Sequence, residues 1–203
     1  TEDLLLNAEY AVVGSEILDF KFLGKTKLKA IARFGGSLEN IDIEAAKENN
    51  IRLLNFKSSA VANEVANLTV GFVLDAAYDC NRLQLANKRS DWKRPIVVGS
   101  ETRVSIFGSG DIGSLVYEKL NMIGFENVEL VSMRKVLAGG ANIKSIGHFV
   151  NNSDVVVLNS SLMCWDRASF NTVLMNCEGV SLVNTARGNL LDEVYMLKHL
   201  DAG

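Results

Sequence analysis

Apolar and polar positions in the first third of the chain alternate between runs typical of strands and spacings typical of helices. Asp42 stands where the N-cap of a short helix belongs, and Glu44 follows in its first turn. Ser15 and Asp19 predict the start of a helical turn that ends near Leu23. The strands expected here, the first of them buried, cover residues 9–13, 28–34 and 51–54, and the short helix covers residues 43–47.

A long helical segment and a second alternation of strands and helices make up the rest of the chain. Val65, Leu68 and Phe72 share one face of the long segment, and we expect most of that segment to lie in the core or in an interface. The apolar run at 155–158 is typical of a strand covered on both faces. Alternation of this kind predicts an α/β fold with parallel sheets. The expected segments are helices over 62–86, 112–123, 143–150, 166–175 and 190–200, and strands over 102–107, 128–131, 155–158 and 179–183.

The stretch from Gly108 to Gly113 joins an expected strand to an expected helix and reads Gly-Ser-Gly-Asp-Ile-Gly. A G-x-G-x-x-G sequence in this context is typical of dinucleotide-binding sites. The first glycine permits a tight turn, Gly110 lets the backbone approach a pyrophosphate, and Gly113 lets helix and strand pack closely. The helix N-terminus, which includes Asp111 and Ile112, would bind the diphosphate. The alternative is a purely structural turn.

Glycine and polar residues follow four expected strands of this second part, namely Gly108, Ser132, Asn159 and residues 184–187. In open parallel sheets, ligands bind beyond the carboxyl ends of the strands. We therefore expect these residues to line one crevice.

Composition and charge narrow the possible functions. The chain has 203 residues, 48% of them hydrophobic, and a net charge of −3, so it can bury a core but has no basic field for nucleic acid or an anionic membrane. Cys80, Cys164 and Cys177 form no C-x-x-C pair and no zinc-like spacing with His148 or His199. Neither a leader nor an apolar run of about 18 residues suggests export or a membrane span. We expect a soluble, cytoplasmic protein without a metal site.

Motifs along nearly the whole chain combine into one pattern. Residues 32–42 read A-R-F-G-G-S-L-E-N-I-D, residues 153–158 read S-D-V-V-V-L, and residues 184–193 read N-T-A-R-G-N-L-L-D-E. With Asn55, Val65-Ala66 and the glycine turn, they resemble the D-isomer-specific 2-hydroxyacid dehydrogenases, the family of D-lactate, glycerate, formate and D-3-phosphoglycerate dehydrogenases. The first motif is similar to the family's G-x-G-x-D-N-I-D loop, and the last to its N-T-A-R-G-x-x-x-D-E signature.

This resemblance implies two domains with doubly wound parallel sheets. Residues 1–60 would form part of a smaller, flavodoxin-like substrate-binding domain. Residues 61–203 would form a Rossmann-type NAD(P)-binding domain without its C-terminal part. The resemblance also implies a homodimer, formed through the segment 62–86 and its surroundings.

The implied activity is an oxidoreductase that transfers hydride between NAD(P)H and the C2 of a small 2-keto or 2-hydroxy acid. Arg187 would be catalytic and bind the carbonyl and carboxylate oxygens of the substrate, because a guanidinium can hold a planar carboxylate bidentately. Backbone N–H groups in the loop of Gly35, Gly36 and Ser37 would bind the substrate carboxylate, although the family usually has glycine at the position of Ser37. The alternatives are a surface ion pair for Arg187 and an ordinary turn for the loop.

The cofactor is NADP or NAD, and the sequence favours NADP. NAD-binding members carry an aspartate at the end of the second strand, where Ser132 stands here, with Arg134 and Lys135 behind it. A carboxylate repels a 2′-phosphate, whereas a charge-assisted contact to one contributes roughly 1.5–3 kcal/mol. The alternative is that the two cations are solvated loop charges. Thr185 and Ala186 would complete the cofactor site.

One departure from the family concerns catalysis. In the family, a general acid/base histidine and the glutamate that orients it follow the N-T-A-R-G region. The sequence ends fifteen residues after Gly188, and neither His148 nor His199 matches the histidine's position. We expect this chain to carry out no hydride transfer. A subset of a longer molecule, a natural or engineered fragment and a member that has lost catalysis all stay open.

Two rival functions need no acid/base. One is a non-catalytic dinucleotide-binding sensor of the same fold, as the related C-terminal-binding corepressors partly are. The other is a nucleotide-binding regulator of the flavodoxin-like or receiver type, which gives no reason for Arg187 in its context.

Overall fold

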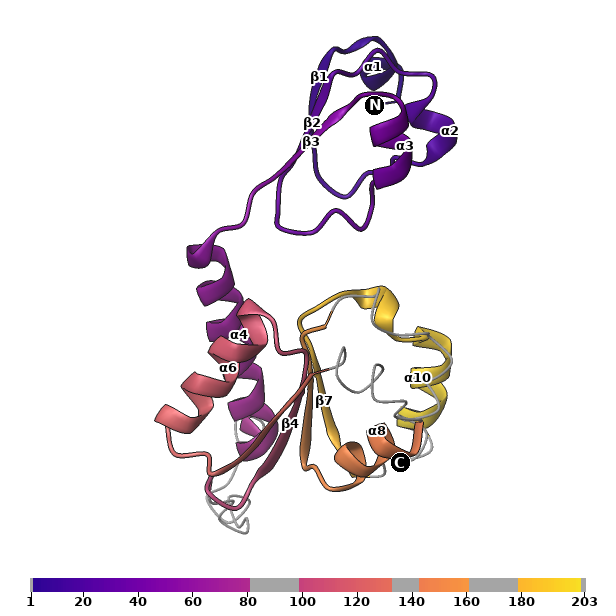
Figure 1. Ribbon diagram of the computed structural model, residues 1–203. Helices are drawn as coiled ribbons and strands as arrows, with labels where there is room; N and C mark the ends of the chain where they lie inside the picture. Colours follow the sequence, from indigo (N-terminus) through magenta and orange to yellow (C-terminus); the bar gives the residue numbers. More distant parts are fainter. Residues whose placement is uncertain (1, 81–98, 133–142, 161–178, 202–203) are drawn as a thin grey trace. The chain divides into compact units, whose positions relative to one another are not determined.

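The structure is a computed structural model that describes residues 2–80, 99–132, 143–160 and 179–201 (Figure 1). The chain divides into two compact units, residues 1–61 and residues 62–203. Each unit contains one sheet of parallel strands, in the order β1-β2-β3 in the first and β5-β4-β6-β7 in the second. Parallel strands that alternate with helices confirm the predicted α/β fold. Across the described residues, no helix is both long and apolar enough to cross a membrane.

The first unit packs its short helices against one face of its sheet (Figure 1). Val13 of β1, Ile31 of β2 and Ala46 of α3 are buried in its core. The elements are α1 (Glu2–Asn7), β1 (Tyr10–Val13), α2 (Phe20–Leu23), β2 (Ala30–Arg33), α3 (Ile43–Glu48) and β3 (Arg52–Asn55). The pattern analysis did not predict α1.

Aspartates cap two helices of this unit. The prediction for α3 is confirmed, because Asp42 Oδ1 accepts a hydrogen bond from the Ala45 N–H at 2.9 Å. At α2, Asp19 Oδ1 accepts from the Phe22 N–H at 2.7 Å. The helical turn therefore begins later than predicted, and Ser15 does not cap it.

The prediction that β1 is buried is wrong for half of its side chains. Tyr10 and Val12 are 69% and 77% exposed, whereas Val13 is buried. Successive side chains of a strand face opposite sides of the sheet. Because the described helices of this unit cover one side, the other side stays accessible.

The second unit has helices on both faces of its sheet (Figure 1). On one face, α4 and α6 pack with Ile106 and Val157, and on the other, α8 and the segment around Leu190 pack with Phe107 and Leu158. The predicted two-sided burial of 155–158 is confirmed. The elements are α4 (Ser59–Tyr78), β4 (Arg103–Phe107), α6 (Asp111–Met122), β5 (Asn127–Val131), α8 (Ile143–Asn151), β6 (Val155–Leu158), β7 (Ser181–Asn184), the 3₁₀ turn η3 (Gly188–Leu190) and α10 (Glu193–Asp201).

Strand β4 is the point at which the second sheet changes direction. It pairs with β5 on one side and with β6 on the other. The chain therefore leaves β4 toward one edge of the sheet and later continues toward the opposite edge. In open α/β sheets, such a switch point is where ligands bind, beyond the carboxyl ends of the strands.

The face that α4 buries in the single chain is not the one that Val65, Leu68 and Phe72 share. The buried residues of α4 are Ala66, Thr69, Val73 and Ala77, whereas Leu68 and Phe72 are 55% and 46% exposed. Three of the four buried side chains are small or polar, and they allow the helix to lie close to the sheet. The large apolar residues consequently point away from it.

Four other expectations need correction or fall outside the described residues. Ile123 is exposed and follows the last residue of α6, instead of extending its buried face. The predicted helix over 190–200 is divided between η3 and α10. The expected helix over 166–175 and the end of the segment 62–86 fall outside the described residues.

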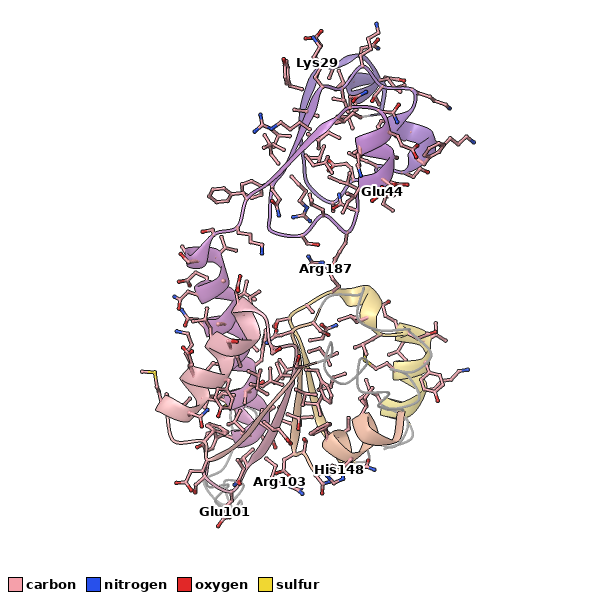
Figure 2. All side chains as sticks on the ribbon, in the orientation of Figure 1. Lys29, Glu44, Glu101, Arg103, His148 and Arg187 are labelled. Carbon is pink, nitrogen blue, oxygen red and sulfur yellow. The ribbon has the colours of Figure 1, made fainter. Side chains whose placement is uncertain are left out.

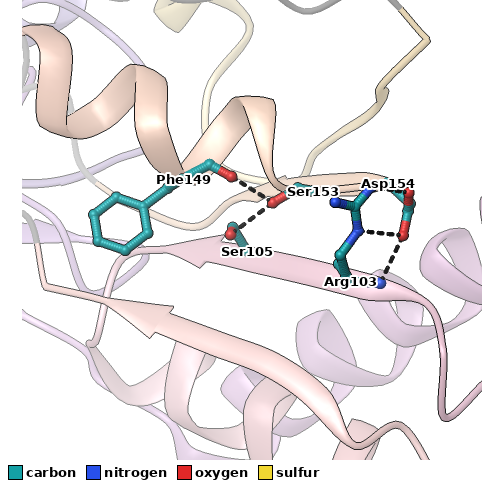
Figure 3. A network of polar contacts seen from close by, with 5 residues as sticks. All are labelled: Arg103, Ser105, Phe149, Ser153 and Asp154. Carbon is teal, nitrogen blue, oxygen red and sulfur yellow. Dashed lines mark hydrogen bonds and ion pairs between the residues drawn. The ribbon is translucent and has the colours of Figure 1, made fainter.

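Polar contacts join the amino ends of two neighbouring strands of the second unit (Figure 3). The Arg103 guanidinium donates two hydrogen bonds to the Asp154 carboxylate, at 2.7 and 3.1 Å, and the Arg103 N–H donates a third at 2.8 Å. Beside them, the Ser153 hydroxyl lies 2.7 Å from both Ser105 Oγ and the Phe149 carbonyl oxygen. These contacts hold β4 and β6 together at the edge opposite the predicted site.

Candidate active site

The carboxyl ends of four neighbouring strands carry residues that the sequence analysis selects. Ser132 follows β5, Gly108 follows β4, Asn159 follows β6 and Thr185 follows β7, in the spatial order of the strands. The structure thus brings these four residues to one edge of one sheet. Arg134, predicted to bind the cofactor with Ser132, lies outside the described residues, as does Lys135.

The glycine turn, residues 108–113, requires glycine at two positions. Gly108 has φ +124°, and a Cβ built there would lie 2.7 Å from the backbone C and O of Asn159. A Cβ at Gly113 would lie 1.8 Å from the Gly108 carbonyl oxygen. The Gly108 N–H donates to the Val131 carbonyl oxygen at 2.9 Å. The turn therefore follows the sheet edge closely, whereas a Cβ at Gly110 would meet no heavy atom of the described residues within 4 Å.

Helix α6 begins inside this turn. Gly110 is its N-cap, without a side-chain cap, and Asp111 and Ile112 are its first two residues. The first N–H groups of a helix have no intrahelical partner and lie at the positive end of the helix dipole. Ile112 packs against the core and so anchors this end of the helix. The arrangement suits an anion such as a diphosphate.

The signature turn, residues 184–187, follows β7. The Asn184 side chain closes it, since its Oδ1 accepts from the Ala186 N–H at 3.1 Å and its Nδ2 donates to the Arg187 carbonyl oxygen at 2.9 Å. The Arg187 side chain is exposed and extends beyond the carboxyl edge of the sheet (Figure 2), with Nη1 donating to the Ala186 carbonyl oxygen at 2.9 Å. The turn therefore presents a guanidinium at the edge that carries the glycine turn.

Two residues outside the predicted site hold the signature turn in place. Thr185 Oγ1 lies 2.8 Å from Asn159 Oδ1 and 2.8 Å from Oγ1 of Thr69 on α4. The sequence predicts that Asn159 lies at this edge but not which residue it contacts. It gives no indication that Thr69 takes part in the site. The signal that could have found Thr69 in the sequence is that a threonine stands among small residues on one face of an otherwise apolar helix.

In the first unit, the predicted substrate loop follows β2. Gly35 has φ +135°, and the Asn55 side chain at the end of β3 donates to the Gly36 carbonyl oxygen at 2.9 Å. Ser37 Oγ accepts from the Glu39 N–H at 3.2 Å, which tightens the loop locally. The Asn40 side chain donates to the backbone after β1, at the Gly14 and Glu16 carbonyl oxygens. These side-chain amides thus fix the backbone conformation of the loop, which lies at the carboxyl edge of its own sheet.

Two carboxyl groups near the sheets have a lowered pKa. Hydrogen bonds from the backbone N–H groups of Glu16 and Gly14 hold the pKa of the Glu16 carboxyl below its usual value. The Arg103 guanidinium lowers the pKa of Asp154 in the same direction. Both carboxylates are therefore ionised at neutral pH, and neither is a general acid.

The two histidines of the sequence do not appear at the carboxyl edge in the described part. His148 is exposed on α8, near Arg103 at the amino edge (Figure 2). The Asn152 side chain lies 3.3 Å from its Nδ1. The side chain of His199 lies outside the description. The structure accordingly gives no reason to assign acid/base chemistry to His148.

Comparison with known proteins adds to this geometry. Residues 70–203 match the model of the NAD-binding domain of the D-isomer specific 2-hydroxyacid dehydrogenases. The chain belongs to this family. The resemblance seen in the motifs is thereby confirmed, and with it the Rossmann-type fold of the second unit.

Individual relatives cover nearly the whole chain. The hydroxypyruvate reductase of Thermotoga maritima is 28% identical over 99% of this chain and 66% of its own length. A D-lactate dehydrogenase from Aquifex aeolicus, in complex with NAD and lactic acid, has a TM-score of 0.78 at 19% identity, over 100% of this chain and 64% of that one. An acyclic imino acid reductase with NADPH and D-Arg has a TM-score of 0.72 at 19% identity, over 99% and 67%. The two structures show the shared fold. The chain spans about two thirds of these proteins.

Proposed function

We propose that the chain provides the cofactor-binding and substrate-binding residues of an NAD(P)-dependent oxidoreductase that transfers hydride between the nicotinamide and the C2 of a small 2-keto or 2-hydroxy acid. One observation carries the proposal: the glycine turn and the Arg187 guanidinium stand at the same sheet edge in a chain of this family. The names of two relatives fit, since hydroxypyruvate is a 2-keto acid and lactic acid a 2-hydroxy acid.

The glycine turn would hold the diphosphate of the cofactor. At Gly110 a Cβ would meet no heavy atom of the described residues within 4 Å, so the backbone is open there and a phosphate could approach it. The N–H groups of Gly110, Asp111 and Ile112 then face the anion at the positive end of α6. When bound, the cofactor supplies or accepts the hydride. Thr185 and Ala186 would contact it at the other end of the same edge.

Arg187 would bind the substrate and act on its reacting carbonyl. Its fork of N–H donors can hold a carboxylate and a neighbouring carbonyl oxygen together. The fixed positive charge stabilises negative charge that develops on that oxygen during reduction. Backbone N–H groups at Gly35, Gly36 and Ser37 would bind the substrate carboxylate.

NADP is the favoured cofactor. Ser132 ends β5 with a hydroxyl, which does not repel a 2′-phosphate as a carboxylate would. Arg134 would add a charge-assisted contact to that phosphate. Two of the related structures are complexes, one with NAD and one with NADPH, so both cofactors occur on this fold.

The protein would also form a homodimer through α4. Leu68 and Phe72 are large, apolar and exposed one turn apart on this helix. Apolar side chains grouped on a helix face in this way are typical of an interface. A second copy of the chain would cover them.

Binding of oxamate, an unreactive analogue of a 2-keto acid, to the chain saturated with NADPH tests the proposed activity. Arg187→Lys keeps the charge but loses the fork. We expect oxamate to bind at least about tenfold more weakly to this variant, with NADPH binding unchanged. The matched control is Arg103→Lys, at the opposite sheet edge. Equal oxamate binding by all three proteins, or none by the unsubstituted chain, would contradict the proposed activity.

A further inference from the structure

Thr69 is a polar residue on an otherwise apolar buried helix face. It is 0% exposed, between Ala66 and Val73 in the core that α4 shares with the sheet. Its Oγ1 lies 2.7 Å from the Val65 carbonyl oxygen in the preceding turn of the helix. A threonine hydroxyl has only one proton, so this contact and the second contact, to Thr185 Oγ1, compete for it.

The second contact extends into a chain of hydrogen bonds that we name the hydroxyl relay: Thr69, Thr185 and Asn159. Thr185 donates to Asn159 Oδ1 at 2.8 Å, which uses its only proton. The contact of 2.8 Å between Thr185 and Thr69 then draws on the one proton of Thr69, which is shared between Thr185 Oγ1 and the Val65 carbonyl oxygen. Thr69 is therefore the donor that leaves the Thr185 hydroxyl free to hold Asn159.

Asn159 depends on this contact. Its Nδ2 is buried and has no hydrogen-bond partner within the part of the chain that the structure describes. The bond from Thr185 is thus the one that fixes its carboxamide there. The Asn159 backbone in turn lies against Gly108, where a Cβ would come within 2.7 Å of its C and O atoms. The hydroxyl relay accordingly runs from α4 through the signature turn to the wall of the glycine turn.

We propose that Thr69 is a positioning residue, whose hydroxyl orients Thr185 and Asn159 and so holds the signature turn and the glycine turn in the geometry that binds the cofactor. This inference rests on the proposed dinucleotide-dependent function. Thr69 itself is buried and touches no ligand; it acts through Thr185. A valine at this position would keep the shape but leave Thr185 Oγ1 without its donor, at a buried site where such a loss is costly.

Titration of the full chain with NADPH, followed by nicotinamide fluorescence, tests the role of Thr69. Thr69→Val should weaken binding by about five- to tenfold, the effect of losing roughly one hydrogen bond. Thr69→Ser, which keeps the donor, should bind within about twofold of the unsubstituted chain. The matched control is Ser153→Ala, which removes a buried hydroxyl from the amino edge of the same sheet. It should lower the melting temperature without changing NADPH binding.

A structural role alone would give a different result. Thr69→Val and Ser153→Ala would then both lower the melting temperature and leave NADPH binding equal, which would overturn the proposal. Equal weakening by both variants would overturn it too, because the effect would not depend on the hydroxyl relay.

The carboxamide signals of Asn159 in a ¹⁵N–¹H correlation spectrum test the hydroxyl relay without any dinucleotide. We expect them to shift in Thr69→Val and to stay in place in Thr69→Ser and Ser153→Ala. Signals that do not move in Thr69→Val would overturn the hydroxyl relay. If the unsubstituted chain bound no NADPH, the proposed function and the binding role of Thr69 would both fail, and the spectra would decide the relay on their own.

Discussion

Gly108 and Gly124 both have a positive φ but differ in their surroundings. Both have positive φ, +124° and +98°, in which a side chain is strained. At Gly108 a Cβ would also meet the Asn159 backbone, whereas at Gly124 nothing lies within 4 Å. Only the first glycine is therefore demanded by a neighbouring part of the fold. The motif spacing within one strand–turn–helix unit predicts a glycine at this position, but not the contact with Asn159, which follows another strand.

Thr69 shows what the sequence alone does not reveal at this scale. Its partner Thr185 is 116 residues away. No periodicity connects two residues at that separation; only the packing of α4 against the sheet brings them together. Asn159 is intermediate, since its place after an apolar strand is predictable and its hydrogen bond is not.

The ion pair between Arg103 and Asp154 leads to a prediction about pH. The Arg103 hydrogen bonds and charge lower the pKa of Asp154 below its usual 3.8. Because the folded state has the lower pKa, the pair stabilises the fold above that value, and the stabilisation is lost as pH falls through the pKa of the folded state. Both side chains are about half exposed, at 51% and 45%, so the contribution is modest.

Urea denaturation of the unsubstituted chain and of Asp154→Asn measures this contribution. At pH 7 the variant should unfold at a lower urea concentration. The difference between the two midpoints should shrink as the pH falls below 3.8. A difference that stays constant down to that range would mean that the Asp154 charge is not its source.

At the scale of elements, α4 has two apolar faces: the buried one carries mostly small residues, and the exposed one carries large residues. Hydrophobic spacing predicts a helix here correctly, because amphipathic periodicity is a local property of the chain. It marks the face of Leu68 and Phe72, which is exposed in the single chain, because these large residues carry a stronger signal than Ala66 and Ala77. Close packing of a helix on a sheet favours the small residues instead.

Strand β1 is misjudged for a related reason: apolar residues do not reveal whether helices cover both sides of a sheet.

Replacement of both exposed residues tests the proposed role of this helix face. Leu68→Asp combined with Phe72→Asp should convert the dimer to a monomer without unfolding it, because both positions are exposed in the single chain. Light scattering coupled to gel filtration should give twice 22.2 kDa before the substitutions and 22.2 kDa after them. Met122→Asp, at an exposed position of α6, is the control and should stay dimeric. A monomeric unsubstituted chain would contradict the dimer.

At the scale of the whole molecule, each unit has a core of its own around a parallel sheet. The alternation of strands and helices predicts both sheets, because parallel strands need crossover connections that the pattern makes visible. The helices that cover each sheet were less predictable: the pattern does not predict α1, and the predicted last helix is divided between η3 and α10. Of the motifs that resemble the family, the glycine turn and the N-T-A-R-G signature meet at one edge of the second sheet.

Titration of the chain with NADPH and with NADH tests the central claim, that the glycine turn of this chain binds a dinucleotide. We predict saturable binding of both, tighter for NADPH, with dissociation constants between about 1 µM and 1 mM. Gly108→Ala should weaken binding at least about tenfold, because its Cβ displaces the turn from Asn159. Gly124→Ala, with the same kind of strain away from the turn, should bind as the unsubstituted chain does. No binding by the unsubstituted chain, or equal binding by the two variants, would contradict the claim.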